Sequence, residues 1–189
     1  MVLEIIKNRW SPVAFSSKKV EDFKLKAILE SSGYAPSSMN EQPWLFILIT
    51  REDSEVFDSV TALLAEGNQV WAKNAYAFIV SLARTSHQYK GRPNRYSFHD
   101  TGMAVANMLL QATSMGICFH QMGGFSIEKA KLYFNLTEDI EPVAIMAVGY
   151  HGDGTGLPEE LVKRDSRRTS RKNISEFVFR NRLDNPAFL

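Results

Sequence analysis

The chain has 189 residues, of which 44% are hydrophobic and 23% are charged, a composition typical of one soluble globular domain. No apolar run approaches the roughly 20 residues that span a bilayer, and the N-terminal segment lacks the order of charged, apolar and small residues found in a signal peptide. One cysteine excludes an internal disulfide and is typical of a reducing compartment. We therefore expect a cytoplasmic protein that has no membrane partner.

The formal net charge of +1 is distributed unevenly along the chain. From residue 163 to the end there are eight Lys or Arg and three Asp or Glu side chains, so this tail carries +5 and the remainder −4. A basic segment of this kind can bind a phosphate group, nucleic acid or an acidic partner. A tail that is merely solvated is the alternative.

The first half of the chain alternates between helical and strand patterns. Apolar side chains at helical spacing predict a helix over 20–33, with Gly33 as its C-terminal cap, and another over 54–65. Residues 44–50 and 75–83 are short and rich in strand formers, which predicts two buried strands. A parallel crossover could join these two strands.

The second half continues the mixture. The polar segment 84–95 is predicted to be a loop, and 97–115 is apolar around most of its circumference, which is typical of a helix in a domain centre or at a subunit interface. Ser126 is predicted to cap a short helix that runs through Phe134, and residues 142–150 to form a third strand. Strands separated by helices indicate a mixed α and β domain.

The chain ends in a segment that is both basic and apolar. Its large apolar side chains have no domain of their own to enter: Ile174, Phe177, Phe179, Leu183 and Phe188. We therefore predict one domain over 1–162 and a C-terminal arm over 163–189 that docks elsewhere, for instance on a second copy of the protein.

A polar run, "APSSMNEQPW", lies between the first predicted helix and the first strand. It places Ser37, Ser38, Asn40 and Gln42 between two prolines, which is more uncharged hydrogen-bonding groups than a turn requires. Neutral amides and hydroxyls can match the edge of a flat polar ring without burying a charge. The run therefore predicts a surface that binds a flat, neutral, polar group.

Three further features are candidate ligand contacts. Arg9 and Ser11 precede a proline, so both side chains can project the same way and suit a phosphate monoester, although a plain surface arginine is the alternative. Asn68 lies past a predicted helix and could be a plain C-terminal cap. The pair Gly123 and Gly124 exposes backbone donors and lets a ligand ring approach closely.

The sequence shows no pattern typical of a metal site, a catalytic triad or a dinucleotide-binding loop. Cys118 has no Cys or His neighbours at metal-ligand spacing, so a structural zinc site is not expected. The four histidines are scattered and define no catalytic triad. The glycine-rich stretch 149–158 does not have the G-x-G-x-x-G spacing and is predicted to be a mobile connection.

In chain order, these motifs resemble those of the nitroreductase family of FMN-dependent oxidoreductases. "NRWSPVAF" is similar to the family's opening Arg-x-Ser motif, and "APSSMNEQPWLF" to its most recognisable block. "GNQVW", "HQMGGF" and "RRTSRKNISEF" fall where the family has its later flavin contacts. The resemblance runs from about residue 3 to residue 179.

The resemblance implies an α+β nitroreductase-like fold with a mostly antiparallel central sheet wrapped by helices. It also implies an intertwined homodimer with helix 97–115 at the interface and the extended arm packed on the partner subunit. FMN is the implied cofactor, held by Arg9, Ser11, Ser37, Ser38, Asn40, Gln42, Asn68, Gly123, Gly124, Arg168 and Arg171. Arg167 is an alternative phosphate contact, and residues 37–42 would reach the flavin of the neighbouring subunit.

The implied activity is reduction of the flavin by NADH or NADPH, followed by electron transfer to a flat acceptor such as a nitroaromatic or a quinone. Because the flavin carries the chemistry, no catalytic acid or base and no metal is expected. Val13 stands where many relatives carry a basic residue, and Trp71 falls close to where some have a lysine, which predicts a less positive flavin site.

Two other classes of function remain open on the sequence. A flavin carrier or sensor with little turnover is the alternative suggested by Val13. A nucleic-acid-binding module could use the basic tail, but the sequence lacks the interleaved aromatic and basic residues of such modules, so no nucleic-acid partner is expected.

Overall fold

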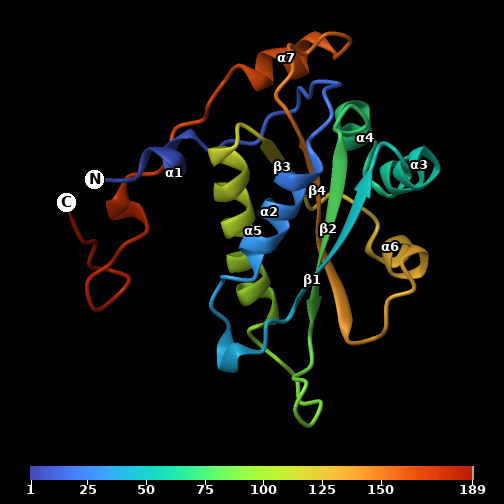
Figure 1. The fold of residues 1–189 in the computed structure, drawn as a ribbon. Helices are drawn as coiled ribbons and strands as arrows, with labels where there is room; N and C mark the ends of the chain where they lie inside the picture. The colour runs from blue at the N-terminus through green and yellow to red at the C-terminus, as the bar shows by residue number, and fades with distance from the viewer. Residues whose placement is uncertain (189) are drawn as a thin grey trace.

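The computed structural model describes residues 1–188 and shows an antiparallel sheet between two layers of helices (Figure 1). The strands, which pair in the order β1-β2-β4-β3, are β1 (Trp44–Thr50), β2 (Ala77–Arg84), β3 (Cys118–Met122) and β4 (Ile140–Gly149). All three pairings are antiparallel. The predicted α+β class and antiparallel sheet are confirmed, whereas the suggested parallel crossover between the first two strands does not occur.

Every helix predicted from apolar periodicity is present. The helical segments are α1 (Glu4–Asn8), α2 (Asp22–Ser32), η1 (Ser38–Asn40), α3 (Ser54–Leu63), α4 (Glu66–Ala72), α5 (Ser97–Ser114), α6 (Ile127–Tyr133), α7 (Glu159–Asp165) and η2 (Ile174–Glu176). Gly33 occupies the C-cap of α2, and the Ser126 side chain accepts the Lys129 N–H at the start of α6, both as predicted. Among residues 1–188, no helix has the length and hydropathy needed to cross a bilayer.

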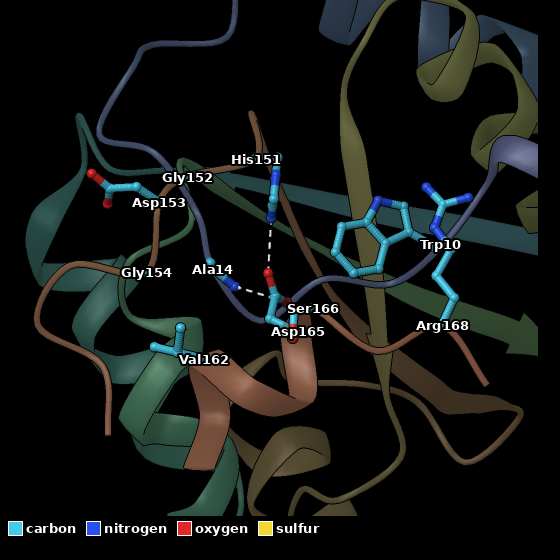
Figure 2. Close-up of a pocket in the computed structure, with 10 residues that line it drawn as sticks. All are labelled: Trp10, Ala14, His151, Gly152, Asp153, Gly154, Val162, Asp165, Ser166 and Arg168. Carbon is cyan, nitrogen blue, oxygen red and sulfur yellow. Dashed lines mark hydrogen bonds and ion pairs between the residues drawn. The ribbon is translucent and has the colours of Figure 1, made fainter. Parts of the chain in front are cut away.

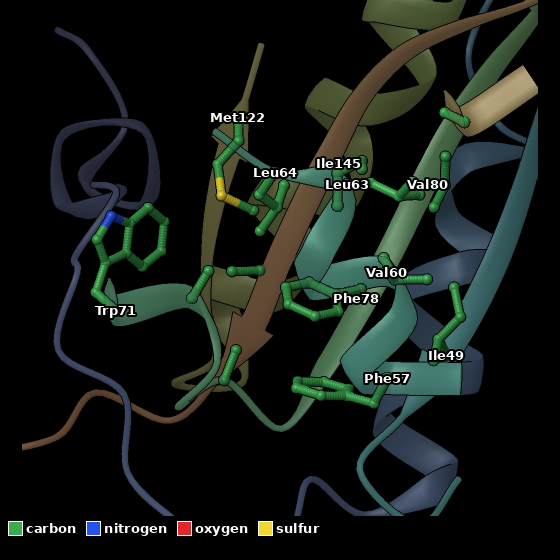
Figure 3. Close-up of a cluster of buried hydrophobic side chains, with 14 of the residues drawn as sticks. Ile49, Phe57, Val60, Leu63, Leu64, Trp71, Phe78, Val80, Met122 and Ile145 are labelled. Atoms are coloured by element: carbon green, nitrogen blue, oxygen red, sulfur yellow. The ribbon is translucent and has the colours of Figure 1, made fainter. Parts of the chain in front are cut away.

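The central strand β2 supplies the core on both faces of the sheet. Its alternate side chains Phe78, Val80 and Leu82 join a cluster with α3 and α4 (Figure 3). Ala77 and Ile79 point the opposite way and pack with α2 and α5. Because both faces are covered, the strand is buried from Ala77 to Ala83, as predicted for 75–83.

The prediction of a buried strand is wrong for β1. It is an edge strand, in which Ile49 is buried while Leu45 and Leu48 are each 39% exposed. Strand β3 was not predicted, because a segment of five residues is too short to show a clear strand pattern. It pairs with β4 and forms the other edge of the sheet.

The two ends of the sheet carry different segments. At one end, the Arg84 N–H donates to the Pro43 carbonyl, so the 37–42 loop lies beside the start of β1. At the other end, Phe15 pairs with His151, so residues 9–15, here called the N-terminal strap, lie beyond the end of β4 (Figure 1). A strand the length of β1 separates these ends by roughly 20 Å.

Candidate functional site

A cavity of about 370 Å³ lies where the N-terminal strap meets the segment after α7. It is lined by Lys7, Arg9, Trp10, Ser11, Arg167, Arg168, Thr169 and Arg171. Five of these eight residues are cationic and none is acidic, so we call it the cationic cavity. The structure thus brings together four residues predicted to bind a phosphate, Arg9, Ser11, Arg168 and Arg171, and adds Arg167, which the sequence left as an alternative.

The electrostatics of the cationic cavity favour an anion. Arg9 Nη1 donates to Ser11 Oγ over 3.1 Å. Burial, and then the neighbouring Arg171 and Arg168, lower the pKa of Arg9, because each of these factors disfavours a further positive charge. A phosphate monoester would relieve this repulsion and accept hydrogen bonds from the guanidinium groups and the hydroxyl. The donor set therefore fits the phosphate of FMN.

Asp165, the last residue of α7, lines a neighbouring pocket that shares Trp10 and Arg168 with the cationic cavity (Figure 2). One carboxylate oxygen accepts the backbone N–H groups of Val13 and Ala14, the latter at 3.3 Å, and the other lies 2.8 Å from His151 Nε2. The carboxylate is buried. It therefore holds the strap that carries Arg9 against the helix that leads into Arg168.

The start of the glycine-rich stretch also holds the strap, which corrects the prediction of a mobile connection. The Gly152 N–H donates to the Ala14 carbonyl over 3.1 Å. A Cβ atom at Gly152 would lie 2.7 Å from the Phe15 carbonyl carbon, so a side chain cannot be accommodated there without a backbone shift. The glycine permits this close approach of two backbone segments.

Asn68 and Gly124 form a second part of the site. Asn68 Nδ2 donates to the Gly124 carbonyl over 3.2 Å, and a Cβ atom at Gly124 would lie 3.0 Å from this nitrogen. Gly123 has open space at its Cβ position. Asn68 lies within α4, so the alternative of a C-terminal cap is wrong. The short helix α4 was missed because its glycine and polar residues give it no clear apolar stripe.

The two positions that depart from the family pattern are buried and uncharged. Val13 and Trp71 are each 1% exposed. His120 packs on Trp71 with ring centroids 4.4 Å apart, and its Nδ1–H donates to the Pro12 carbonyl over 2.7 Å. Burial lowers the pKa of His120, which favours the neutral ring. His120 belongs to the "HQMGGF" motif, but its contact with the strap could not be inferred from the motif.

The 37–42 loop is held in an uncommon backbone conformation. Three of its residues have φ between 48° and 56°, namely Met39, Asn40 and Gln42. Such values cost energy in residues other than glycine and cluster at ligand-binding segments. The loop is fixed by the Gln42 N–H, which donates to Ser37 Oγ over 3.0 Å, and by the Ser38 N–H, which donates to the buried Asp100 carboxylate over 2.9 Å.

The predicted site residues thus form three groups: Asn68 with Gly123 and Gly124, and two larger groups at opposite ends of the sheet (Figure 1). The strap and the segment after α7 carry Arg9, Ser11, Arg168 and Arg171, at the end of the sheet opposite the 37–42 loop. One chain does not bring the loop to the cationic cavity. Within residues 1–188, no group of three or more His, Cys, Asp or Glu side chains could hold a metal ion.

Comparison with known proteins identifies the fold family. A sequence model of the Nitroreductase family matches residues 6–150, which is most of the chain. The chain belongs to the nitroreductase family. The chain is 33% identical, over 132 residues, to an uncharacterized 15.4 kDa protein in the ask 5' region of Mycolicibacterium smegmatis, covering 70% of the present chain and 87% of that protein.

Two further comparisons concern a named relative and the fold. The chain is 28% identical to a putative NADH dehydrogenase/NAD(P)H nitroreductase of Archaeoglobus fulgidus, over 80% of its own length and 86% of that protein. The crystal structure of an oxidoreductase containing FMN superposes with a TM-score of 0.91 at 30% identity, covering 98% and 94% of the two chains. The predicted family and the nitroreductase-like fold are confirmed, and the predicted cofactor agrees with this FMN-containing structure.

Proposed function

We propose that this protein is an FMN-dependent oxidoreductase that takes hydride from NAD(P)H and reduces a flat acceptor such as a nitroaromatic or a quinone. The cationic cavity carries the proposal, because five basic side chains and two hydroxyls surround one space that no acidic residue lines. Steady-state oxidation of NADH or NADPH by the purified protein, with a quinone present, tests it. No oxidation of either nucleotide would leave the carrier or sensor alternative.

FMN, when bound, supplies hydride acceptance from the nicotinamide and electron transfer to the acceptor. The protein's own residues bind and orient it. Arg9, Arg168 and Arg171 would hold the phosphate with charge-assisted hydrogen bonds. The Asn68–Gly124 contact would offer a polar edge beside open space at Gly123. We propose the cytoplasm as the compartment, on the cysteine count alone.

We further propose that two chains complete each flavin site. The 37–42 loop lies about one strand length from the cationic cavity of its own chain. Its side chains would therefore contact the flavin that is bound in the cationic cavity of a partner chain. The partner's loop would then supply Ser37, Ser38, Asn40 and Gln42. This proposal predicts a homodimer with two equivalent flavin sites.

Exposed apolar surface at the chain ends supports the dimer. Phe177, Leu183 and Phe188 are each more than half exposed in the single chain, and so are Val2 and Leu3 near α1. A soluble monomer seldom exposes this much contiguous apolar surface. The arm and α1 lie side by side beyond α5 (Figure 1), which places this surface next to the helix expected at the interface.

The arm leaves the body after Asp165. Its predicted start at residue 163 falls within α7, whose last residue contacts the strap and His151. Residues 166–188 contain Arg167, Arg168 and Arg171, followed by the apolar side chains. We therefore propose that the first part of the arm binds the phosphate and that the remainder packs on the partner.

We expect Arg9→Ala to weaken FMN binding by about 10- to 100-fold while changing riboflavin binding much less. Loss of a charge-assisted hydrogen bond to the phosphate costs about 1.5–3 kcal/mol, and riboflavin has no phosphate. Fluorescence titration of the apoprotein with each ligand gives both Kd values. Arg182→Ala, which removes a cation outside the cavity, is the control. Equal losses for FMN and riboflavin would make Arg9 a structural residue only.

We expect Asp165→Asn to weaken FMN binding by about tenfold, because the amide cannot accept hydrogen bonds through both of its ends. The strap would then be free to move Arg9 away from Arg168. Asp153→Asn is a matched control, since the Asp153 side chain accepts the nearby Thr155 N–H and not the N–H groups of the strap. The same FMN-to-riboflavin comparison is the measurement, with thermal unfolding to verify the fold. Unchanged FMN affinity in a folded variant would refute the clamp.

A further inference from the structure

A second cavity, of about 280 Å³, lies at the end of the sheet that carries the 37–42 loop. It is lined by Met39, Glu41, His87, Tyr89, Lys90 and Arg92. Two of these residues belong to the loop that is proposed to contact the flavin, and the other four to the segment 86–93. We call this cavity the hairpin pocket. Nothing in the proposed flavin site uses it.

The 86–93 segment is a hairpin that presents fixed side chains. Ser86 pairs with Pro93, and the His87 N–H donates to the Arg92 carbonyl over 2.7 Å. Lys90 and Gly91, at the tip, have φ of 64° and 56°, as a tight hairpin turn requires. The sequence interpretation of 84–95 as a loop is therefore refined, because most of this loop is hydrogen bonded.

The acidic residue of the hairpin pocket is engaged within the protein. Glu41 Oε2 accepts the Gln88 N–H over 3.1 Å, and Oε1 lies 3.4 Å from His87 Nδ1. This second contact lies at ion-pair distance, although the buried Nδ1 is not aligned for a hydrogen bond. The Glu41 side chain is only 12% exposed. Its carboxylate thus ties the hairpin to the 37–42 loop and forms part of the wall.

The two long cationic side chains of the hairpin pocket are free. Among residues 1–188, neither Lys90 nor Arg92 has an acidic partner within ion-pair distance. Lys90 Nζ lies 4.8 Å from the ring centroid of Tyr89, which is itself 71% exposed. The pocket therefore combines two unpaired cations with an exposed aromatic face and the exposed Met39.

We propose that the hairpin pocket binds the 2′-phosphate end of NADPH, so that NADPH is the preferred electron donor. This inference rests on the proposed function. A phosphate monoester is recognised by two convergent cations, whereas NADH would present only a neutral hydroxyl at the same place. Tyr89 offers a surface on which the adenine can stack. Because the pocket shares Met39 and Glu41 with the 37–42 loop, the nicotinamide end can extend from it toward the flavin.

The test uses the FMN-loaded protein and the double variant Lys90→Asn with Arg92→Gln. Asparagine tolerates the positive φ at position 90, so the change removes charge without adding backbone strain. The Kd values of NADP⁺ and NAD⁺ are measured by titration, and kcat/KM is measured for NADPH and NADH with the same quinone. Arg95→Gln is the control, since the Arg95 guanidinium lies 5.2 Å from the Tyr96 ring and outside the hairpin pocket.

We expect the wild type to prefer NADP⁺ over NAD⁺, and the double variant to lose about 10- to 100-fold in NADP⁺ affinity with little change for NAD⁺. The kcat/KM ratio of NADPH to NADH should fall by the same factor. The inference would be overturned by a wild type with equal affinity for both nucleotides. It would also be overturned by a double variant in which only the KM for the quinone rises. A wild type that oxidises neither nucleotide, yet still binds NADP⁺ more tightly than NAD⁺, would instead refute the proposed activity.

Discussion

A chain that ends at Lys172 is expected to lose both the dimer and the flavin. This truncation keeps α7, the Asp165 contacts and all three arginines of the segment 167–171. It removes the apolar part of the arm. That part includes Leu183 and Phe188, which are both more than half exposed in the single chain. If that surface packs on a partner, its removal deprives each cationic cavity of the partner's 37–42 loop. Flavin loss would then follow from the lost partner rather than from a lost phosphate contact.

Sedimentation velocity of the truncated protein, together with its visible absorbance, decides this prediction. The charge-only variant Arg180→Ala with Arg182→Ala is the control, because it leaves the apolar side chains in place and should remain a yellow dimer. A truncated protein that sediments as a stable, yellow dimer would refute the proposed role of the arm. A truncated protein that is a colourless dimer would show that residues 173–189 are needed for flavin binding but not for dimer formation. The arm would then lie outside the dimer interface.

The double variant Asn40→Gly with Gln42→Gly is expected to bind FMN about 10- to 10⁴-fold more weakly while keeping its fold. Each lost hydrogen bond leaves a partly buried polar group of the flavin unpaired, at a cost of about 1–3 kcal/mol. Glycine rather than alanine is the appropriate replacement, because both residues have positive φ and glycine adopts that region without steric cost.

Met39→Gly is the matched control for this variant. Met39 has φ of 55° and is 83% exposed, so its replacement introduces the same backbone freedom without removing an amide side chain. The two proteins are compared by gel filtration followed by measurement of the bound flavin. Equal flavin retention in the double variant and the control would show that the loop's amides do not contact the flavin.

The sequence predicted the helices that have one apolar stripe facing the core and the strand that is apolar on both faces. Helices α2, α3 and α5 and strand β2 have such patterns, and each was predicted to within a few residues. The burial of β1 was not predictable, because an apolar strand at the sheet edge and one in its centre have the same local sequence. Which strand lies at the edge depends on the pairing of β2 with β4, which is far away in the chain.

The residues of the candidate site could be predicted where they belong to one short sequence motif. They could not be predicted where their role depends on contacts between segments that are distant in the sequence. The residues at 9–11 and 37–42 stood out by spacing and by an excess of polar groups. Asp165 did not, since a lone acid in a basic tail has an ordinary sequence environment. Its role arises because folding brings residues 152 positions apart into a hydrogen bond. The contact of His120 with the Pro12 carbonyl is equally non-local.

The hairpin pocket could not be predicted from the sequence for the same reason. Lys90 and Arg92 looked like ordinary loop cations in the sequence. Only the structure shows that, among residues 1–188, neither of them forms an ion pair, although Glu41 lines the same pocket. Free and paired charges are indistinguishable in a linear sequence.

The most direct measurement of the central claim is the visible absorption spectrum of the purified protein, before and after anaerobic addition of NADPH. We predict the absorption bands of an oxidised flavin, which bleach on addition of NADPH and return when a quinone is added. A protein that is colourless and takes up no added FMN would contradict the assignment of the cofactor. A yellow protein whose bands persist with both NADPH and NADH would contradict the proposed oxidoreductase activity.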